Sequence, residues 1–580
     1  MNRNITFFLL PLAFALGVHA ANPVLPTIPS TVFNVTNYGA VGDGLKDNST
    51  NIQNTINAAN AAGGGVVEIP AGTFLCGPIR LLSKINLRVD TNGMLKMLPL
   101  GAYPVGTTNA QTFIGCNGAQ DVEISGWGKI DGQGAAWWEY FNTNNTIVRP
   151  MMLNLYNCDR LFIHDITYQN PPNHHCGLRS HGGNITISNL TIQTVSPSPN
   201  TDGLNFVGTN CIIENSHISD GDDNIAMGST GPLFDLLITN CQFGTGHGVS
   251  IGSGISGITN LTVANCGFNG TGNGLRIKCA EDNSLPIRNL NYLNISMTNV
   301  ALPIVFYTYY NIVGTPDRIP TSEVLASSNT FPVNATTPDW ANITISNLTA
   351  TSTDIGGIIW GPAEKPINNV TLSHVSITAP KTFDLYNVRG VQVIDSTFNF
   401  SSGNTFTLCN AGLTVSNSAP GGPAITIGGA ASSNSLALFN INASMTSTDA
   451  FACNPILLND SALTNTGSLV FSNNQVIQFA LGTNITSSMA VSGNLTLNGT
   501  VNITNAAGFT ATNYVLFTYS GSLSGHPIIG SMPAGYHGAL DIGTPGKVQL
   551  IATYTGMSSV PTTNTIPFST SLTFAIPALP

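Results

Sequence analysis

The sequence predicts an all-β protein, a right-handed single-stranded parallel β-helix with an additional β-rich C-terminal region. Two observations carry this prediction. Runs of alternating apolar residues are each followed by Asn, and Asn189, Asn215, Asn240 and Asn265 lie 26, 25 and 25 residues apart. No helical pattern separates these runs. A period of two indicates strands, and a strand-bearing unit repeated at this interval buries its apolar face only by stacking on its neighbours.

The repeated phrase orders the elements along the chain. Residues 33–100 begin the solenoid, and residues 54–62 are expected to form a short helix that caps its N-terminal end. From about residue 160 the phrase recurs until about residue 400. Because Asn returns at the same place in each coil, we expect these side chains to form a hydrogen-bonded ladder at a bend. They are therefore interpreted as scaffold.

Composition narrows the class of protein. Only 8% of the 580 residues are charged, which is low for a globular protein and suits an extracellular β-rich chain. The net charge of −10 gives no broad basic field for nucleic acid or anionic lipid. With only 18 Lys and Arg in the chain, two that stand close together in a motif are informative.

Four parts are expected along the chain. Residues 1–20 are typical of a signal peptide, with Arg3 ahead of a short apolar stretch and cleavage after Ala20 or Ala21. Residues 31–400 form the β-helix, and residues 401–555 are a β-rich accessory region, either a second, looser solenoid or a β-sandwich. Residues 556–580 are a Pro/Thr/Ser-rich tail. No later segment is typical of a membrane span. We expect the protein to be secreted and to act as a monomer.

Ten cysteines in an exported chain permit disulfides, but the sequence does not give their pairing. Cys211, Cys241 and Cys266 lie inside apolar runs, where a buried free thiol is equally plausible. No tight Cys/His cluster indicates zinc.

Four polar motifs fall in successive coils. They are Asn-Thr-Asp-Gly at residues 200–203, Gly-Asp-Asp-Asn at 221–224, Gly-His-Gly at 246–248 and Asn-Gly-Leu-Arg-Ile-Lys at 273–278. Asp202 and Asp222 are 20 residues apart, Asp223 and His247 are 24 apart, and His247 and Arg276 are 29 apart. Each step is about one coil, so three carboxylates, an imidazole and two cations are expected to meet on one face.

The residue types in this cluster indicate a reaction. Arg276 and Lys278 point to the same face of a strand, and a sugar carboxylate would balance their charges. Asp222 and Asp223 can both reach that face only at a bend, which Gly221 favours. Crowded carboxylates do not all ionise easily, so one is expected to stay protonated at mildly acidic pH. One carboxylic acid beside one carboxylate is the requirement of glycoside hydrolysis.

Each motif alone is more typical of a turn or a solvated face, and only their order and spacing indicate a site. In that order they resemble glycoside hydrolase family 28, the polygalacturonases, and most of all its bacterial branch. The resemblance runs from about Phe33 to about Phe400. It includes Ile-Asp-Gly-Gln-Gly at residues 130–134, followed by Trp137 and Trp138, and Phe-Gly-Thr-Gly-His-Gly-Val-Ser-Ile-Gly at 243–252.

This resemblance implies roles for the acidic cluster. Asp222 would be the general acid, Asp202 and Asp223 would activate the attacking water, and His247 would support protonation of the acid. The resemblance also implies inversion at the anomeric carbon and no need for a metal or another cofactor. Asn224 stands where many eukaryotic members have Cys, and it changes no catalytic group.

The resemblance also implies the binding residues. Arg276 and Lys278 would hold the galacturonate carboxylate beside the cleaved bond, and Tyr310 would line the same subsite. Asn200, in the first motif, completes the predicted substrate-binding set. The substrate is then pectin or polygalacturonate, cut internally, although the 311–341 loop does not settle endo against exo action.

Three alternatives remain open at this stage. A pectate lyase would use the same polymer and fold but would need a calcium site. Rhamnogalacturonan or xylogalacturonan could replace polygalacturonate as the substrate of a hydrolase. A non-enzymatic polysaccharide-binding adhesin is favoured only for the C-terminal part, where residues 511–519 and 533–537 resemble autotransporter-like surface proteins and would associate the protein with a cell surface.

Overall fold

The computed structural model of the protein describes residues 22–105, 111–179, 183–228, 233–252, 257–280, 283–310, 332–418, 424–427, 434–447, 453–484 and 487–556. The predicted signal peptide, nearly all of the predicted tail and residues 311–331 of the loop named above lie outside the described residues.

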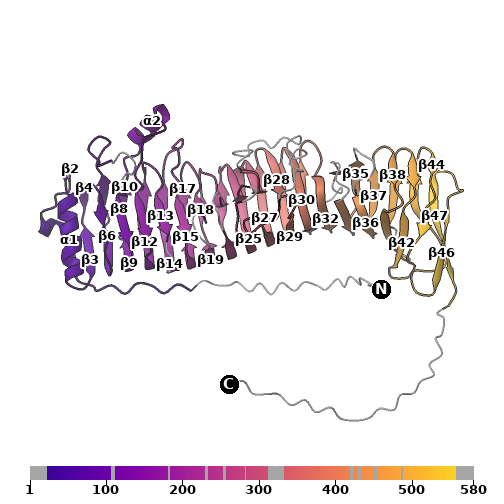
Figure 1. Cartoon of the computed structure of the whole chain (residues 1–580), viewed down its shortest axis with the longest axis horizontal. Helices are drawn as coiled ribbons and strands as arrows, with labels where there is room; N and C mark the ends of the chain where they lie inside the picture. The colour runs from indigo at the N-terminus through magenta and orange to yellow at the C-terminus, as the bar shows by residue number, and fades with distance from the viewer. Residues whose placement is uncertain are drawn as a thin grey trace, which may run out of the picture.

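Strands of successive coils pair side by side in parallel and build one elongated right-handed β-helix, as predicted (Figure 1). The first ladder contains the strands that include or follow the four polar motifs of the predicted site. It runs through β8 (Ile114–Asn117), β11 (Leu153–Tyr156), β13 (Cys176–Arg179), β15 (Leu204–Val207), β18 (Ile225–Met227), β21 (Val249–Ile251), β24 (Asn273–Lys278), β26 (Leu302–Tyr307), β28 (Ile355–Trp360), β30 (Lys381–Ile394) and β32 (Phe406–Ser416).

Two further ladders complete each coil. The second runs through β3 (Gly65–Ile69), β6 (Ile85–Val89), β9 (Gln120–Ser125), β12 (Asp159–Gln169), β14 (Gly183–Gln193), β16 (Thr209–Glu214), β19 (Leu233–Thr239), β22 (Ile258–Ala264), β25 (Ile287–Val300), β27 (Trp340–Ser352) and β29 (Ile367–Ala379). The third runs through β4 (Gly72–Cys76), β7 (Gly93–Met97), β10 (Lys129–Asp131), the far ends of β12 and β14, β17 (His217–Ser219), β20 (Gln242–Phe243) and β23 (Gly267–Asn269).

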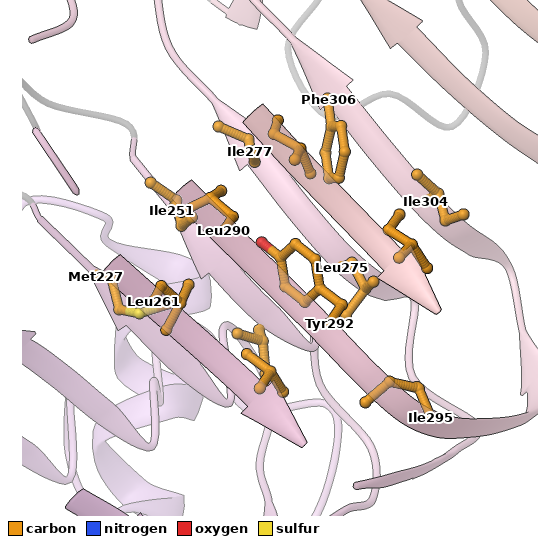
Figure 2. Packing of buried hydrophobic residues seen from close by; sticks show 14 of the residues in the cluster. Met227, Ile251, Leu261, Leu275, Ile277, Leu290, Tyr292, Ile295, Ile304 and Phe306 are labelled. Atoms are coloured by element: carbon orange, nitrogen blue, oxygen red, sulfur yellow. The ribbon is translucent and has the colours of Figure 1, made fainter. Parts of the chain in front are cut away.

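The core is the inside of the coils. In β24 the inward side chains Leu275 and Ile277 are fully buried, and the alternating residues Arg276 and Lys278 point outward. Figure 2 shows Leu275 and Ile277 in the packed interior together with Leu290 and Tyr292 of β25. Burying each such side chain contributes about 1.5–3 kcal/mol. The inward residues therefore fix the register that aligns the outward ones.

The Asn ladder is confirmed. Asn265, Asn294 and Asn347 all have positive φ, near +55°, a conformation that Asn adopts more readily than most residues. The Asn294 amide donates to Asn265 Oδ1 at 2.9 Å, and the Asn347 amide donates to Asn294 Oδ1 at 3.1 Å. Each Asn thus makes the bend of its own coil and a hydrogen bond to the preceding coil.

The ends of the solenoid are closed in different ways. Helix α1 (Ser49–Ala61) packs Ile52 and Ile56 against the first coils and begins five residues earlier than predicted. Its earlier start follows from Ser49, whose hydroxyl accepts from the Gly77 backbone and ties the first turn to the solenoid. Strands β1 (Val32–Asn34), β2 (Asp43–Asp47) and β5 (Ile79–Arg80) belong to the same end, and helix α2 (Ala135–Thr143) projects from the body (Figure 1).

The parallel ladders cross residue 400 without a break. After β32 they continue through β33 (Ala424–Ile427), β34 (Asn434–Phe439), β35 (Ala443–Ser447), β36 (Cys453–Asn459), β37 (Ala462–Asn465), β39 (Val476–Leu481), β40 (Ser488–Val491) and β42 (Thr500–Asn505), with β38 (Leu469–Phe471), β41 (Leu495–Leu497) and β44 (Leu523–Ser524) as a small separate sheet. The far end is antiparallel, with β47 (Lys547–Tyr554) between β43 (Asn513–Tyr519) and β46 (Tyr536–Asp541). This antiparallel end covers the last open edge.

None of the ten cysteines, all of which the structure describes, forms a disulfide, and nine of them are buried. The coils are therefore not linked by disulfides. Burial raises the pKa of the Cys176 thiol, which keeps it neutral. Among the described residues, no helix has the length and apolar character needed to cross a membrane.

Candidate active site

The four sequence motifs meet because the first ladder is in register. Leu204 of β15 pairs with Ile225 of β18, Ile225 pairs with Val249 of β21, and Val249 pairs with Leu275 of β24. The turns that precede these strands therefore lie above one another. The turns contribute the carboxylates and the imidazole, and β24 contributes the two cations.

Glycines let these turns pack closely. Gly248 has a φ of +70°, and a Cβ there would lie 2.2 Å from the Asn273 carbonyl oxygen of the next coil. Gly221 approaches the preceding coil in the same way, since a Cβ would lie 2.3 Å from the Ser198 carbonyl oxygen. The glycines that flank Asp222 and His247 are therefore required by backbone contact between coils, which brings the side chains of adjacent turns together.

Asp222 lies at the partly exposed side of the cluster, with 25% of its side chain exposed. Its Oδ1 accepts from the Asp223 backbone N–H at 2.9 Å and lies 3.1 Å from His247 Nδ1. The Asn200 amide reaches its other oxygen at 3.5 Å, and the Arg149 guanidinium in turn donates to Asn200 Oδ1 at 2.7 Å. His247 and Asn200, both predicted as site residues, therefore contact the same carboxyl group.

Asp223 is the buried centre of the cluster. Arg276 Nη1 donates to its Oδ1 at 3.1 Å, Lys278 Nζ donates to its Oδ2 at 2.8 Å, and the Ser250 hydroxyl donates to Oδ1 at 2.8 Å. Burial acts to raise the pKa of Asp223, but the charges of Lys278 and Arg276 outweigh it and hold that pKa below its ordinary value. Asp223 is therefore ionised and cannot be the acid of the cluster.

The two cations differ from expectation in one respect. Arg276 and Lys278 do lie side by side, but the anion that balances them in the structure is Asp223, and their side chains are only 1% and 6% exposed. A sugar carboxylate was expected to balance the two charges, but Asp223 occupies the position between them. Tyr310 lies over the pair, with its ring centre 5.3 Å from Lys278 Nζ and 5.9 Å from Arg276 Cζ.

Asp202 stands one coil before Asp222 and is mostly buried. Its Oδ2 accepts from the Asn205 amide at 3.2 Å, and its Oδ1 lies 3.0 Å from His174 Nδ1. All eight predicted residues therefore lie in this region: Asn200, Asp202, Asp222, Asp223, His247, Arg276, Lys278 and Tyr310. Their contacts divide them into a buried ion network at Asp223 and a more open group at Asp222.

Sequence reasoning missed His174. The Asp202 carbonyl accepts from the His175 backbone N–H, which places His174 beside Asp202 in the preceding coil. The signal was present, because His174 lies 28 residues before Asp202, or about one coil. It was overlooked because no glycine-rich turn surrounds it.

Asp220 was also missed, and it is the carboxyl with the strongest bias toward the protonated form. It is fully buried and accepts from the Asp222 backbone N–H at 3.1 Å and from the Asn224 amide at 3.2 Å. Burial raises the pKa of Asp220 well above its ordinary value, and the nearby charges of Asp202 and Asp223 add to this effect. Asp220 is thus a carboxyl whose protonated form is favoured, but it was not among the predicted residues and it lies beneath the site.

Among the described residues, one group of carboxylates and imidazole is close enough together to contact a single metal ion. Ligand atoms of Asp222, Asp223 and His247 lie within 4.8 Å of one another. However, Arg276 and Lys278 already contact Asp223, and their positive charges oppose a metal ion at that carboxylate. Independence from metal ions stays a prediction.

Comparisons with known proteins agree with this geometry. A model of the Glycosyl hydrolases family 28 matches residues 63–397, which include all four motifs. An endo-polygalacturonase of Pectobacterium carotovorum subsp. carotovorum is 30% identical over 379 residues, which cover 59% of this chain and 88% of that protein.

Solved structures show the same architecture. The polygalacturonase from Erwinia carotovora ssp. carotovora is 27% identical, with a TM-score of 0.50 over 66% of this chain and 97% of that one. A hyperthermoactive exopolygalacturonase from Thermotoga maritima is 21% identical, with a TM-score of 0.53 over 65% of this chain and 94% of that one. At this identity, the second comparison shows that the two proteins share a fold and nothing more.

Proposed function

Because the chain belongs to glycosyl hydrolases family 28, and is therefore a glycoside hydrolase, we propose that it hydrolyses α-1,4-galacturonosidic bonds of pectin and polygalacturonate by an endo-acting, inverting mechanism. The observation that carries this proposal is the contrast between two adjacent carboxyl groups. Asp223 is ionised and held by two cations, while Asp222 is partly exposed beside His247. Two carboxyl groups in different environments can take two different roles in glycoside cleavage.

In the proposed mechanism Asp222 protonates the leaving oxygen. Two donors, the Asp223 backbone N–H and the Asn200 amide, reach its carboxyl group, and His247 Nδ1 lies 3.1 Å from it, so its orientation is held before substrate arrives. His247, with 35% of its side chain exposed, can supply a proton from solvent. Geometry held in advance lowers the cost of reaching the transition state.

Asp202 and Asp223 activate the attacking water in this proposal. Arg276 and Lys278 keep Asp223 in its carboxylate form, which is the form a base requires. The same cations and Tyr310 present positive charge and an aromatic ring to the galacturonate next to the cleaved bond. A water molecule attacks from the face opposite to the acid, and the anomeric configuration inverts.

The experiment follows the anomer that forms first. Proton NMR of polygalacturonate digestion, recorded within the first turnovers, should show the inverted anomer before mutarotation. Viscosity measured in parallel should fall early relative to reducing-end release, as internal cutting requires. First release of the retained anomer would contradict the mechanism, and activity only on rhamnogalacturonan or xylogalacturonan would contradict the substrate.

Location and the remaining chain are part of the proposal. We propose secretion through the signal peptide at residues 1–20, action as a monomer, and an accessory role for residues 401–555 in association with a cell surface. Support comes from the leader-like composition of the first twenty residues and from a C-terminal region that lies outside the family match, which ends at residue 397.

A further inference from the structure

We propose that Arg149 is a positioning residue of the hydrolase, which acts through Asn200 to hold the carboxyl group of Asp222 in the orientation that proton transfer requires. The inference deepens the proposed function and rests on it, since it takes Asp222 as the acid. The residues concerned lie in the turns that precede β11, β13 and β15 and in helix α2.

The guanidinium of Arg149 crosses the turns of the two following coils. Its Nη1 donates to two backbone carbonyl oxygens, that of Pro172 at 3.0 Å and that of Pro199 at 2.6 Å. Its Nη2 donates to Asn200 Oδ1 at 2.7 Å. The side chain is only 8% exposed, so these three bonds are shielded from competing water. Arg149 therefore holds three successive turns in a fixed arrangement.

Helix α2 supports Arg149 from the outside. The ring centre of Phe141 lies 3.7 Å from the Arg149 Cζ atom, which is a close cation–π contact. Trp138 Nε1 donates to the Pro171 carbonyl at 2.9 Å, in the turn that the guanidinium crosses first. The helix that projects from the solenoid (Figure 1) thus contacts both the guanidinium and one of the turns beneath it.

The chemistry of Arg149 determines which way the Asn200 amide faces. A guanidinium offers donors and no acceptor, so the oxygen of the Asn200 amide has to face Arg149. The Nδ2 atom of Asn200 is thereby turned toward Asp222, and it donates to Asp222 Oδ2 at 3.5 Å. If the amide were reversed, two acceptors would meet at Asp222 and two donors would meet at Arg149.

The Asn200 amide contacts the oxygen of Asp222 that is left for the reaction. Asp222 Oδ1 already accepts from the Asp223 backbone N–H and lies beside His247 Nδ1. The proton for the leaving oxygen is therefore carried on Oδ2. Rotation of an Asp carboxyl group about its last side-chain bond is soft, so a donor at Oδ2 is needed to fix the direction of that proton. Small errors of direction at a reacting group are costly.

Arg389 shows the same arrangement where it serves only the scaffold. It donates to the carbonyl and to Oδ1 of Asn410, and burial lowers its pKa as burial lowers that of Arg149. The Nδ2 atom of Asn410 then donates to Asn387 Oδ1 at 2.8 Å, within an Asn ladder. The two arrangements differ in what the amide reaches, which is another scaffold Asn in one case and the proposed acid in the other.

The test is a double-mutant cycle on turnover of de-esterified polygalacturonate. Arg149→Gln removes the charge and the forked donors, and we expect kcat to fall about tenfold, the equivalent of about 1.4 kcal/mol, with KM changed by less than about twofold. Asn200→Gly removes the amide and accepts the φ of +55° at that position, and it should give a similar loss without removing the buried charge. The double variant should lose no more than either single variant, because Arg149 acts through Asn200.

Arg389→Gln is the matched control, and it should lower the melting temperature while kcat stays at the wild-type value. Losses that multiply in the double variant would overturn the proposal, because Arg149 would then act independently of Asn200. A higher KM with unchanged kcat in Arg149→Gln would overturn it as well, since it would make Arg149 a substrate-binding cation. Equal kcat losses in Arg149→Gln and Arg389→Gln would indicate a structural role. Failure of the wild-type enzyme on polygalacturonate would instead contradict the proposed function itself.

Discussion

The coils of the active site and the coils after residue 355 share one backbone and differ in their outward side chains. The positions of Arg276 and Lys278 in β24 are occupied by Asp384 and Tyr386 in β30, three coils later. In the later coils Tyr386 packs with Trp360 and Tyr309 into a buried aromatic cluster. The backbone of the β-helix therefore supplies only a row of outward positions. The residues at these positions determine whether the row forms a polar ion network or a buried aromatic cluster.

The largest expected effect comes from the acid. Asp222→Asn removes the transferable proton and leaves the hydrogen bonds of the turn largely intact, so turnover of polygalacturonate should fall at least 100-fold or so while the fold and polymer binding persist. The matched change is Asp384→Asn, which removes a carboxyl from the same outward row outside the cluster. Turnover in Asp222→Asn close to that of Asp384→Asn would remove Asp222 as the acid.

The next effect concerns the buried cations. Lys278→Ala leaves Asp223 with one cation fewer, which should cost about 3 kcal/mol of folding stability and raise KM for the polymer. Lys129→Ala serves as the distant control. Thermal unfolding and steady-state kinetics, measured on both variants, check this prediction, and equal effects at the two positions would place Lys278 outside the binding site.

The depressed pKa of Asp223 gives this prediction a pH dependence. A carboxyl whose folded pKa lies below its unfolded value of about 3.9 contributes stability that is present above that value and is lost as pH falls through the folded pKa. In Lys278→Ala the pKa of Asp223 should rise toward its ordinary value. The stability difference between wild type and variant should therefore shrink in acid, and a constant difference would contradict the assignment.

Asp220 should show the opposite sign. Its folded pKa lies well above the ordinary value, so the folded state keeps a proton that the unfolded state releases. Stability is then lost as pH rises from about 4 toward the folded pKa. Asp220→Asn removes this loss, so the melting temperature of the variant minus that of wild type should increase with pH. A difference independent of pH would show that Asp220 does not titrate with folding.

The smallest effect compares the scaffold in the two regions. Asn294 and Asn440 both have positive φ and both donate to the Asn of the preceding coil, at 2.9 Å in each case. Replacement of either by Ala should cost about 1–2 kcal/mol, since Ala adopts this conformation at a cost of that size, whereas replacement by Gly should cost less. Urea unfolding measures both, and equal losses for Ala and Gly would mean that the hydrogen bond, rather than the bend, is what matters.

Structural features that depend on a local sequence pattern were predicted well. Alternation and the Asn interval predicted the coils, and the one-coil spacing of Asp202, Asp222 and His247 predicted that their turns stack on one another. The pairing of Asp223 with Arg276 and Lys278 was not predictable in the same way, because it depends on which side chain of Asp222 and Asp223 turns inward. The pKa of Asp220 depends on burial by several coils at once, and no motif records that burial.

The β-helix also continues beyond residue 400, where the repeated sequence phrase is no longer clear. Its repeated phrase fades because Ser, Thr and Ala replace larger residues, yet the parallel ladders continue, since inward Leu and Ile such as Leu436, Ile456 and Ile477 still pair in register. A β-helix needs only its inward positions to be apolar. The β-helix therefore extends further along the chain than the repeated sequence phrase does.

The most direct test of the central claim is reducing-end release from de-esterified polygalacturonate by wild type and Asp222→Asn, with ultraviolet absorbance recorded in parallel and chelator in a matched sample. We expect reducing ends from wild type alone, with no new absorbance and no effect of chelator. New absorbance that chelator abolishes, or equal release by Asp222→Asn, would contradict hydrolysis by the carboxyl cluster.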